Sequence, residues 1–529
     1  MPIGSYLSKY GYVVRKDSIT DDELKILKTE LIAKPLCDDK YISKVGPRST
    51  YPIYIETKNK LYIPKMYGIN RYGDPKRYMP NYTGKPWDNI DLTFNGVLFE
   101  NQKEPVNALI NACKNNGGGI LKAGTGIGKT YMSINVLSQL KIKTIIIVNK
   151  IPLMHQWKNE LESLIPGISI GIIQGQKNVQ VEGNDVVIAM LQSLARIQYP
   201  DSLFEDFGLA IFDEIHNTSS RVFSKVLSKL CCKYTIGLSA TPNRSDGCEY
   251  VFKYHIGDIV YNSNSKRDGL PPILNIIRID SSEYKEINTI NKITGQSQIQ
   301  YTSMLSELTI MPKRNKIILE IIRDLVVREG RKILVLSDRR EHLKQLKNIL
   351  DNDLAVNFTY GLFLGQMKQN DLARSRSSQV ILATFSAFGE GVSEKDLDTL
   401  ILITPKKFIG HLKKSTKNEN GKLEQIVGRI FRKNHIDKNP LIVDLQDNFS
   451  VYKNQSHQRR MFYKQYFKNS IVNSYAINLD DYDIDQLNMD CIQKIRTTRV
   501  IKDNDIGESN STLENNVMTT LLSQCVIDD

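Results

Sequence analysis

The stretch 119–130, GILKAGTGIGKT, constrains the fold of this chain more than any other. A short apolar run over 119–121 precedes a glycine-rich loop, and a helix-like segment follows over 131–140. This order predicts a phosphate-binding loop, because glycines let successive N–H groups face the phosphates and the helix N-terminus adds partial positive charge. Lys129 is expected to reach the β- and γ-phosphates, and the Thr130 hydroxyl is expected to bind Mg²⁺.

The loop residues expected to contact the nucleotide are Ala123, Gly124, Thr125, Gly126, Ile127, Gly128, Lys129 and Thr130. Ala123 stands where the strict pattern has glycine. Its side chain is small enough to leave the loop unchanged.

Composition excludes several classes of protein. A chain of 529 residues with 41% hydrophobic residues can bury the cores of several domains, so wholesale disorder is excluded. No apolar run approaches the ~20 residues of a membrane span, and charges interrupt any signal-peptide core at the N-terminus. The seven cysteines lack metal-ligand spacing and are expected to be reduced thiols of an intracellular protein.

The net charge of +13 is unevenly distributed. From Leu479 onward there are eleven acidic and four basic residues, a charge of −7, so the first 478 residues carry +20. The positive charge of the first 478 residues favours a polyanionic partner, and nucleic acid is the first candidate.

Two regions alternate apolar strand-like runs with helical patterns. Near-continuous Ile and Val runs such as 144–148 and 399–403 indicate strands buried on both faces, as in parallel sheets covered by helices. The fold class is therefore α/β, with two tandem doubly wound parallel-sheet domains. The expected parts are an accessory domain with helix 21–32 over 1–95, a first α/β domain with the phosphate loop over 96–245, and a linker with a helix near 302–310 over 246–312. They are followed by the second α/β domain over 313–448, a helical basic and aromatic extension over 449–496, and a mobile acidic tail over 497–529.

Two carboxylates follow the apolar run 209–212 in the sequence Asp213-Glu214-Ile215-His216. The end of a buried strand beside the phosphate-loop strand is where a second acid of a nucleotide site belongs. We expect Asp213 to hold Mg²⁺ and Glu214 to orient and deprotonate the attacking water. Ser239, Ala240 and Thr241 follow the next strand-like run and are expected to relay the nucleotide state to Asp213 and His216.

Two arginines three residues apart, Arg429 and Arg432, share one face of a helix-like segment with Gln425. The guanidinium is always charged and matches phosphate oxygens, so arginine fingers from the second domain are expected.

With these motifs in this order, the chain resembles superfamily 2 helicases of the DExH group. The matching segments are 123–130 for motif I, 213–216 for motif II, 239–242 for motif III, 425–432 for motif VI, 98–102 for the glutamine motif, 148–157 for motif Ia, 190–194 for the motif after it, 333–338 for motif IV and 383–392 for motif V. The resemblance covers about 98–445. The form GLSATPNRSDG and the tyrosine-rich front segment are most similar to the transcript-release helicases of poxviruses and related helicases of large DNA viruses.

The resemblance implies RecA-like domains, ATP and Mg²⁺ as cofactors, and a role in viral transcription. It implies that Gln102 reads adenine, that Gly391 contacts the nucleotide, and that Gln192, Ser193, Arg196 and Thr384 contact a strand. The expected partners are single-stranded nucleic acid, DNA favoured over RNA, and RNA polymerase or other transcription proteins. A monomer is expected, in the host cytoplasm and the virion, with no membrane attachment.

Four functions compete. An ATPase that unwinds duplexes is favoured by the full motif set. An RNA helicase or a double-stranded DNA translocase that moves without unwinding shares every motif. A non-catalytic scaffold would require degenerate motifs, whereas Lys129, Asp213 and Arg429 are present.

Overall fold

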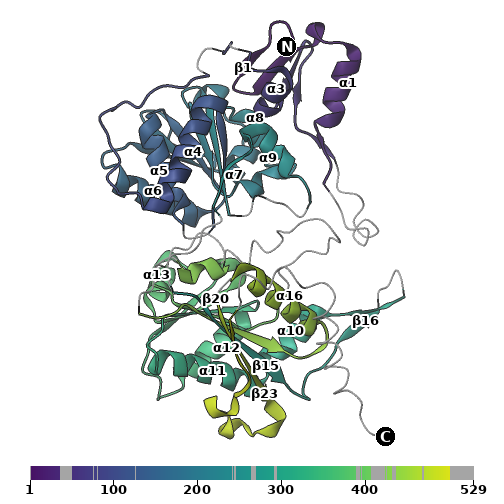
Figure 1. The fold of residues 1–529 in the computed structure, drawn as a ribbon, viewed down its shortest axis with the longest axis vertical. Coiled ribbons are helices and arrows are strands. Elements are labelled where there is room, and N and C mark those ends of the chain that lie inside the picture. The colour runs from purple at the N-terminus through teal and green to yellow at the C-terminus, as the bar shows by residue number, and fades with distance from the viewer. Residues whose placement is uncertain are drawn as a thin grey trace. The chain divides into compact units, whose positions relative to one another are not determined.

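The structure is a computed structural model that forms two compact units, drawn in Figure 1. Unit 1 comprises Met1–Arg267, Glu390–Ser393 and Ile409–Arg429, and unit 2 comprises Asp268–Gly389, Glu394–Phe408 and Ile430–Asp529. The residues that the structure describes are 2–35, 50–75, 77–79, 82–124, 127–240, 242, 246–263, 270–290, 295–388, 394, 396–406, 423, 426–431, 437–467 and 470–500.

An eight-stranded sheet in the order β10-β9-β11-β8-β12-β13-β7-β14 forms the centre of unit 1. Its strands are β7 (Gly118–Lys122), β8 (Thr144–Val148), β9 (Ile170–Gln174), β10 (Asn178–Val179), β11 (Val186–Met190), β12 (Leu209–Phe212), β13 (Tyr234–Ser239) and β14 (Ile259–Asn262). All neighbouring strands are parallel except β9 and β10. The predicted parallel sheet is confirmed.

Helices cover both faces of this sheet. The helices are α4 (Glu100–Asn116), α5 (Lys129–Leu140), α6 (Ile151–Leu164), α7 (Leu191–Arg196), α8 (Ser224–Lys229) and α9 (Glu249–Ile256). Ile146 and Val148 pack with α4, α5 and α6, whereas Ile145 and Ile147 belong to the core on the face of α7, α8 and α9. Side chains alternate along a strand, so a strand buried on both faces reads as a continuous apolar run.

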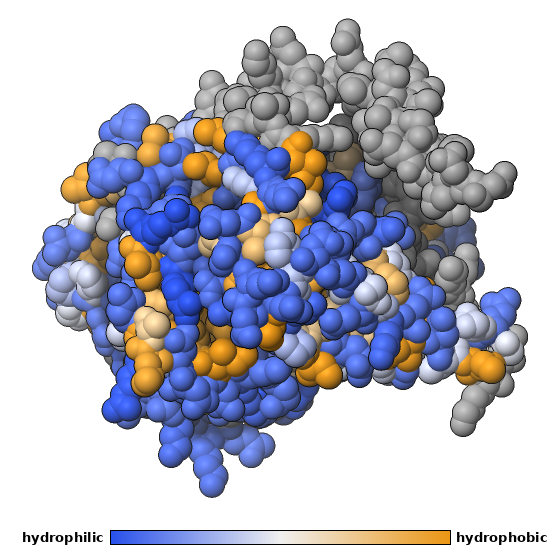
Figure 2. Space-filling view, turned by 90° about the horizontal axis from the view of Figure 1, so that it is seen from below, coloured by the Kyte–Doolittle hydropathy of each residue, from blue (hydrophilic) through white to orange (hydrophobic). Residues whose placement is uncertain are grey.

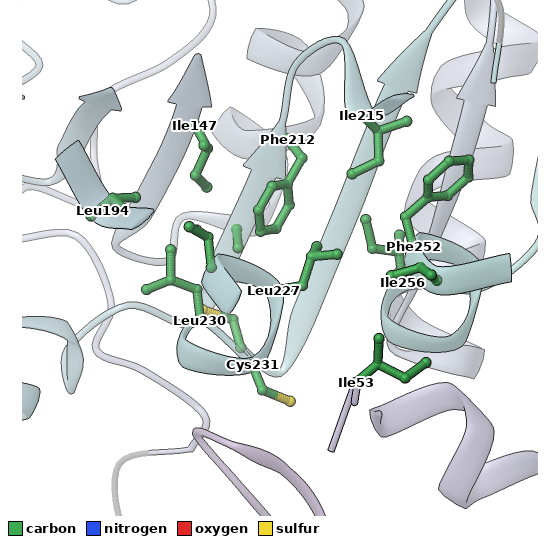
Figure 3. Packing of buried hydrophobic residues seen from close by; sticks show 14 of the residues in the cluster. Ile53, Ile147, Leu194, Phe212, Ile215, Leu227, Leu230, Cys231, Phe252 and Ile256 are labelled. Atoms are coloured by element: carbon green, nitrogen blue, oxygen red, sulfur yellow. The ribbon is translucent and has the colours of Figure 1, made fainter. Parts of the chain in front are cut away.

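The first 95 residues contribute a small sheet in the order β1-β2-β6-β5. Its strands are β1 (Tyr6–Ser8), β2 (Gly11–Arg15), β5 (Ile55–Glu56) and β6 (Lys60–Ile63), with a separate pair β3 (Ile32–Ala33) and β4 (Tyr51–Pro52) and helices α1 (Asp21–Glu30) and α3 (Lys65–Tyr72). Figure 3 shows Ile53 beside Phe252 and Ile256 of α9, so this segment shares a core with the large sheet.

Lys65 attaches the small sheet to the large one. The side chain is only 1% exposed, and its Nζ donates to the carbonyl oxygens of Gly117 at 2.9 Å and Cys232 at 3.1 Å. Burial lowers the pKa of this amine. A lysine in the tyrosine-rich stretch 63–80 is therefore part of the interior, at the amino ends of β7 and β13.

The second sheet, in unit 2, has the order β19-β20-β18-β21-β22-β15-β23-β24. Its strands are β15 (Ile273–Asp280), β18 (Ile333–Ser337), β19 (Tyr360–Phe363), β20 (Val380–Thr384), β21 (Thr399–Leu402), β22 (Leu441–Asp447), β23 (Ile471–Asn478) and β24 (Gln493–Val500). Only β24 pairs antiparallel. Its helices are α10 (Tyr301–Ile310), α11 (Pro312–Val327), α12 (Arg340–Asp351), α13 (Gln369–Ser377), α14 (Phe385–Phe388) and α16 (Ser450–Tyr466), and β16 (Asn288–Ile290) pairs with β17 (Ser297–Ile299).

Two expected irregular or helical stretches contain strands. The stretch 246–312 supplies β14 to the first sheet and β15 to the second, and its helix near 302–310 is confirmed as α10. Within 449–496 the helix ends at Tyr466 and is followed by β23. Asn275 and Arg278 interrupt the apolar residues of β15, and Asn473 and Ser474 interrupt those of β23, so neither strand shows the continuous apolar run used as the strand signal. The expected start of the tail at 497 is wrong, because β24 continues to Val500, and the rest of the tail lies outside the described residues.

Three aromatic side chains and one arginine of α16 are buried, namely Tyr452, Phe462, Tyr463 and Arg459. Arg459 is 2% exposed, and its Nε lies 3.0 Å from both carboxylate oxygens of Asp444. The hydroxyl of Tyr463 donates to the same carboxylate at 3.2 Å. These residues brace the helix against β22.

The surface of unit 2 seen in Figure 2 is mostly hydrophilic, with hydrophobic residues in small separate groups. None of the helices in the described part of the chain combines the length and apolar character needed to cross a membrane.

We predict that unit 2 loses stability in mild acid because of His342. This side chain is 1% exposed, its Nδ1 lies 3.1 Å from Ser337 Oγ, and its Nε2 lies 2.9 Å from Asn315 Oδ1. An amide oxygen only accepts, so Nε2 carries a proton. Burial lowers the pKa of His342 to about 3, and the charge of Arg314 acts in the same direction.

Below the ordinary histidine pKa of about 6.5, His342 binds a proton in the unfolded chain but stays unprotonated in the folded chain. Stability should therefore fall as pH drops from about 6.5 toward 3, by up to ~1.4 kcal/mol per pH unit for this group. Thermal unfolding between pH 7.5 and pH 5 measures this loss. The variant His342→Gln should have a shallower pH dependence, and an unchanged slope would contradict the assignment.

Candidate active site

The phosphate-loop candidate begins at the carboxyl end of β7 and ends in the first turn of α5. Ala123 is buried, its N–H donates to the Ser239 carbonyl at 3.0 Å, and Gly128 precedes α5 with φ of 90°. A left-handed residue suits glycine because it lacks a Cβ. The strand, loop and helix order is confirmed, while Thr125 and Gly126 lie outside the described residues.

Lys129 and Gln102 both contact the loop backbone. Lys129 Nζ donates to the carbonyl of Ala123 at 3.0 Å, which holds the amine over the start of the loop. Gln102 Nε2 donates to the Ile127 carbonyl at 2.9 Å, and Gln102 Oε1 accepts from Phe99 N at 3.1 Å. Gln102 therefore connects the start of α4 to the loop, and its assignment to adenine remains a prediction.

The residues around the loop fit a phosphate group with Mg²⁺. A Cβ placed on Gly128 would meet Gln102 Nε2 at 2.6 Å, so a larger residue here would displace the Gln102 side chain from the loop. Lys129 and Thr130 occupy the first turn of α5, where N–H groups and the helix dipole favour an anion. Thr130 and Asp213 offer the oxygen atoms that Mg²⁺ prefers.

Asp213 lies directly after β12, and the expectation that β12 neighbours the loop strand is wrong. β13 lies between β12 and β7, with Phe212 opposite Gly237 and Ser239 opposite Lys122. The carboxyl ends of three adjacent parallel strands therefore carry Asp213, Ser239 and the phosphate loop. An apolar run predicts a strand but not the strands that pair with it, so the position of β13 between β12 and β7 could not be predicted from the sequence.

Both carboxylate oxygens of Asp213 accept hydrogen bonds. Trp157 Nε1 donates to Oδ2 at 2.9 Å, and the Glu214 N–H donates to Oδ1 at 3.0 Å. Burial raises the pKa of Asp213 to about 6, and the negative charge of Glu214 acts in the same direction. The Trp157 hydrogen bond and the charge of Lys129 act in the opposite direction.

Glu214, His216 and Ser239 form one polar group. Glu214 has a left-handed φ of 49°, and its Oε2 lies 3.3 Å from His216 Nδ1. Ser239 Oγ lies 3.2 Å from the same nitrogen, while Asn217 Nδ2 lies 3.3 Å from Nε2. The Asn217 amide nitrogen can only donate, so His216 Nε2 accepts and its Nδ1–H faces Glu214 and Ser239. Contact between the Ser239 and His216 side chains is confirmed.

The four residues expected to contact a strand differ in exposure and partners. Ser193 is 9% exposed and accepts from Gly175 N at 2.9 Å, and Gln192 Nε2 donates to the Asn149 carbonyl at 2.7 Å. Arg196 is exposed at the end of α7. Thr384, in unit 2, is 5% exposed at the end of β20, and its hydroxyl accepts from Ala387 N at 3.3 Å. Their strand contacts remain predictions.

The remaining predicted site residues are only partly described. Ala240 and Arg429 are each 3% exposed, and Arg429 belongs to a short 3-10 helix over Gly428–Phe431. The residues Thr241, Gly391, Gln425 and Arg432 lie outside the described residues.

Trp157 and Asn217 contact the site and were not assigned to it from the sequence. Trp157 was visible only as part of motif Ia. The available signal was general: a buried indole N–H requires an acceptor. Nothing in the sequence indicated that this acceptor is Asp213.

The sequence of this chain is similar to those of several known proteins. Residues 95–244 match the family model described as "Type III restriction enzyme, res subunit". The chain is 30% identical over 485 residues to an Acanthamoeba polyphaga mimivirus protein named "Putative ATP-dependent RNA helicase", covering 90% of this chain and 89% of that protein.

A protein of African swine fever virus (isolate Pig/Kenya/KEN-50/1950) with the same descriptive name is 26% identical over 369 residues, covering 65% of this chain and 68% of that protein. Among solved structures, a fragment of an HsdR subunit of a type I restriction enzyme from Vibrio vulnificus has a TM-score of 0.49 and 18% identity, covering 74% of this chain and 71% of that one.

Proposed function

This chain belongs to the superfamily 2 ATP-dependent helicases of large DNA viruses, and we propose that it couples ATP hydrolysis to movement along a strand and to unwinding of DNA or DNA–RNA hybrid in viral transcription. The observation that carries the proposal is that the phosphate loop, Ser239 and Asp213 follow three adjacent parallel strands, with Lys129 in contact with the start of the loop. A site of this kind holds a nucleoside triphosphate between a phosphate loop and an acid.

The residues have distinct roles in hydrolysis. Lys129 leaves the Ala123 carbonyl for the phosphates, and the first turn of α5 supplies N–H donors. Thr130 and Asp213 would hold Mg²⁺, which neutralises charge on the phosphates when bound. Glu214 accepts the proton of the attacking water, and Arg429 and Arg432 stabilise the charge of the transferred phosphate.

Ser239 links hydrolysis to the protein's conformation. Its carbonyl accepts from Ala123 N at 3.0 Å, and its hydroxyl lies 3.2 Å from His216 Nδ1. A change at the phosphates would therefore move β13 and the polar group together. Such a coupling would make the protein bind and release the nucleic-acid strand in turn during each cycle. Contacts to the strand's phosphates give little sequence preference.

RNA is the second candidate substrate, because the mimivirus relative is named as an RNA helicase. ATP hydrolysis by the full chain should be measured at one salt concentration with single-stranded DNA, duplex DNA, DNA–RNA hybrid or RNA added. We expect stimulation by single-stranded DNA, followed by ATP-dependent strand displacement. Stimulation by RNA alone would assign the chain to RNA, stimulation by duplex without displacement would indicate a translocase, and absent hydrolysis would favour a scaffold.

A further inference from the structure

Trp157 lies in the interior of unit 1, in contact with the predicted metal-binding acid. Its side chain is 0% exposed on α6, and Nε1 donates to Asp213 Oδ2 at 2.9 Å. The other oxygen of Asp213 accepts from Glu214 N at 3.0 Å. The indole therefore sets the orientation of the carboxylate from a different element of the fold.

Packing alone does not account for an indole at this position. A phenylalanine would fill much of the same apolar space without a polar atom, whereas the indole N–H requires an acceptor when buried. The acceptor is one of the two oxygens available to a metal ion. Partners of this kind orient metal ligands and tune their affinity.

The same helix begins next to a residue expected to contact the strand. Gln192 Nε2 donates to the carbonyl of Asn149 at 2.7 Å, and α6 starts two residues later at Ile151. Trp157 itself is buried and cannot touch a strand. Two hydrogen bonds, joined by the backbone from Asn149 into α6, thus connect Gln192 to Asp213.

We propose that Trp157 is a positioning residue that holds the Asp213 carboxylate for Mg²⁺ and transmits strand engagement at the start of α6 to the ATP site. The inference rests on the proposed function, since it takes Asp213 as the metal-binding acid. It concerns a role for Trp157 in affinity for the metal, in addition to its part in the core.

The chain has two tryptophans, which provides a matched pair of variants. Trp87 is also buried, at 2% exposure, and its Nε1 donates to the Ile142 carbonyl at 3.1 Å, away from Asp213. W157F and W87F each remove one buried indole N–H, and each leaves a single tryptophan. Fluorescence from W87F therefore reports on Trp157 alone.

Emission of the two variants should be recorded with ADP while Mg²⁺ is added, with EDTA as the reference. We expect the emission of W87F to change with Mg²⁺ and that of W157F to stay constant. If Mg²⁺ binds together with ADP but the Trp157 emission of W87F does not change, the proposal is overturned. The W87F measurement needs neither hydrolysis nor a folded W157F protein.

Hydrolysis by W157F should need about tenfold more Mg²⁺ for half-maximal rate, with most of the maximal rate recovered at saturation. W87F should match the native chain. Strand stimulation of W157F should fall at least about fivefold. A Mg²⁺ requirement equal to that of W87F overturns the positioning role, and full strand stimulation overturns the transmission. Absence of hydrolysis by the native chain would instead refute the proposed function, while the ADP titration still tests Trp157.

Discussion

Lys129→Ala should reduce ATP hydrolysis by at least about 10²- to 10³-fold, the loss typical when one preorganised charge-stabilising group is removed. Lys129 is the first residue of α5, and its Nζ lies 3.0 Å from the Ala123 carbonyl, at the start of the loop. Without the amine, no lysine from this turn of α5 reaches the phosphates. Steady-state hydrolysis with saturating strand measures the loss.

Strand binding by Lys129→Ala should remain within a few-fold of the native chain. The residues expected to contact the strand in unit 1 lie on α7 after β11, separate from the loop. Lys103→Ala is the matched control, since Lys103 lies on the exposed part of α4 and pairs with Glu100 at 2.6 Å. Native hydrolysis by Lys129→Ala, or loss of strand binding along with hydrolysis, would refute the role of Lys129.

Arg314→Met should destabilise unit 2 by about 3–5 kcal/mol, the usual cost of leaving a buried charge without its partner. Both side chains of the Arg314–Asp447 pair are 0% exposed. Arg314 Nε donates to Asp447 Oδ1 at 2.7 Å, and Nη2 donates to Oδ2 at 2.9 Å and to the Ile403 carbonyl at 2.7 Å. The pair connects the start of α11 to the carboxyl ends of β21 and β22.

The loss should be measured by urea unfolding with hydrogen exchange at the amides of β21 and β22, which reports on this part of the molecule. Because replacing both members of a buried pair by apolar residues is often nearly neutral, adding Asp447→Leu to Arg314→Met should restore much of the stability. A single variant as stable as the native chain would show that the pair contributes little. A double variant less stable than the single one would show that Asp447 matters chiefly through Tyr284, whose hydroxyl donates to it at 2.8 Å.

Local signals in the sequence identified the elements that surround the phosphate loop. The glycines and the apolar run 209–212 report on their own backbone and burial, so β7, α5 and β12 follow from neighbouring residues. β15 and β23 were missed because polar residues such as Asn275 and Asn473 interrupt their apolar runs. Pairing partners are not encoded in the periodicity of a single segment.

The two α/β units and the phosphate-loop residues could be predicted from the sequence alone, because those properties are local. Three other features required the folded structure: β13 separates Asp213 from the loop, Trp157 donates to Asp213 from 56 residues away, and Arg314 pairs with Asp447 from 133 residues away. Hydrogen bonds and ion pairs of this kind form between side chains that only folding brings together. A buried polar group requires a hydrogen-bond partner, and the packing of the sheet and helices determines which group that partner is.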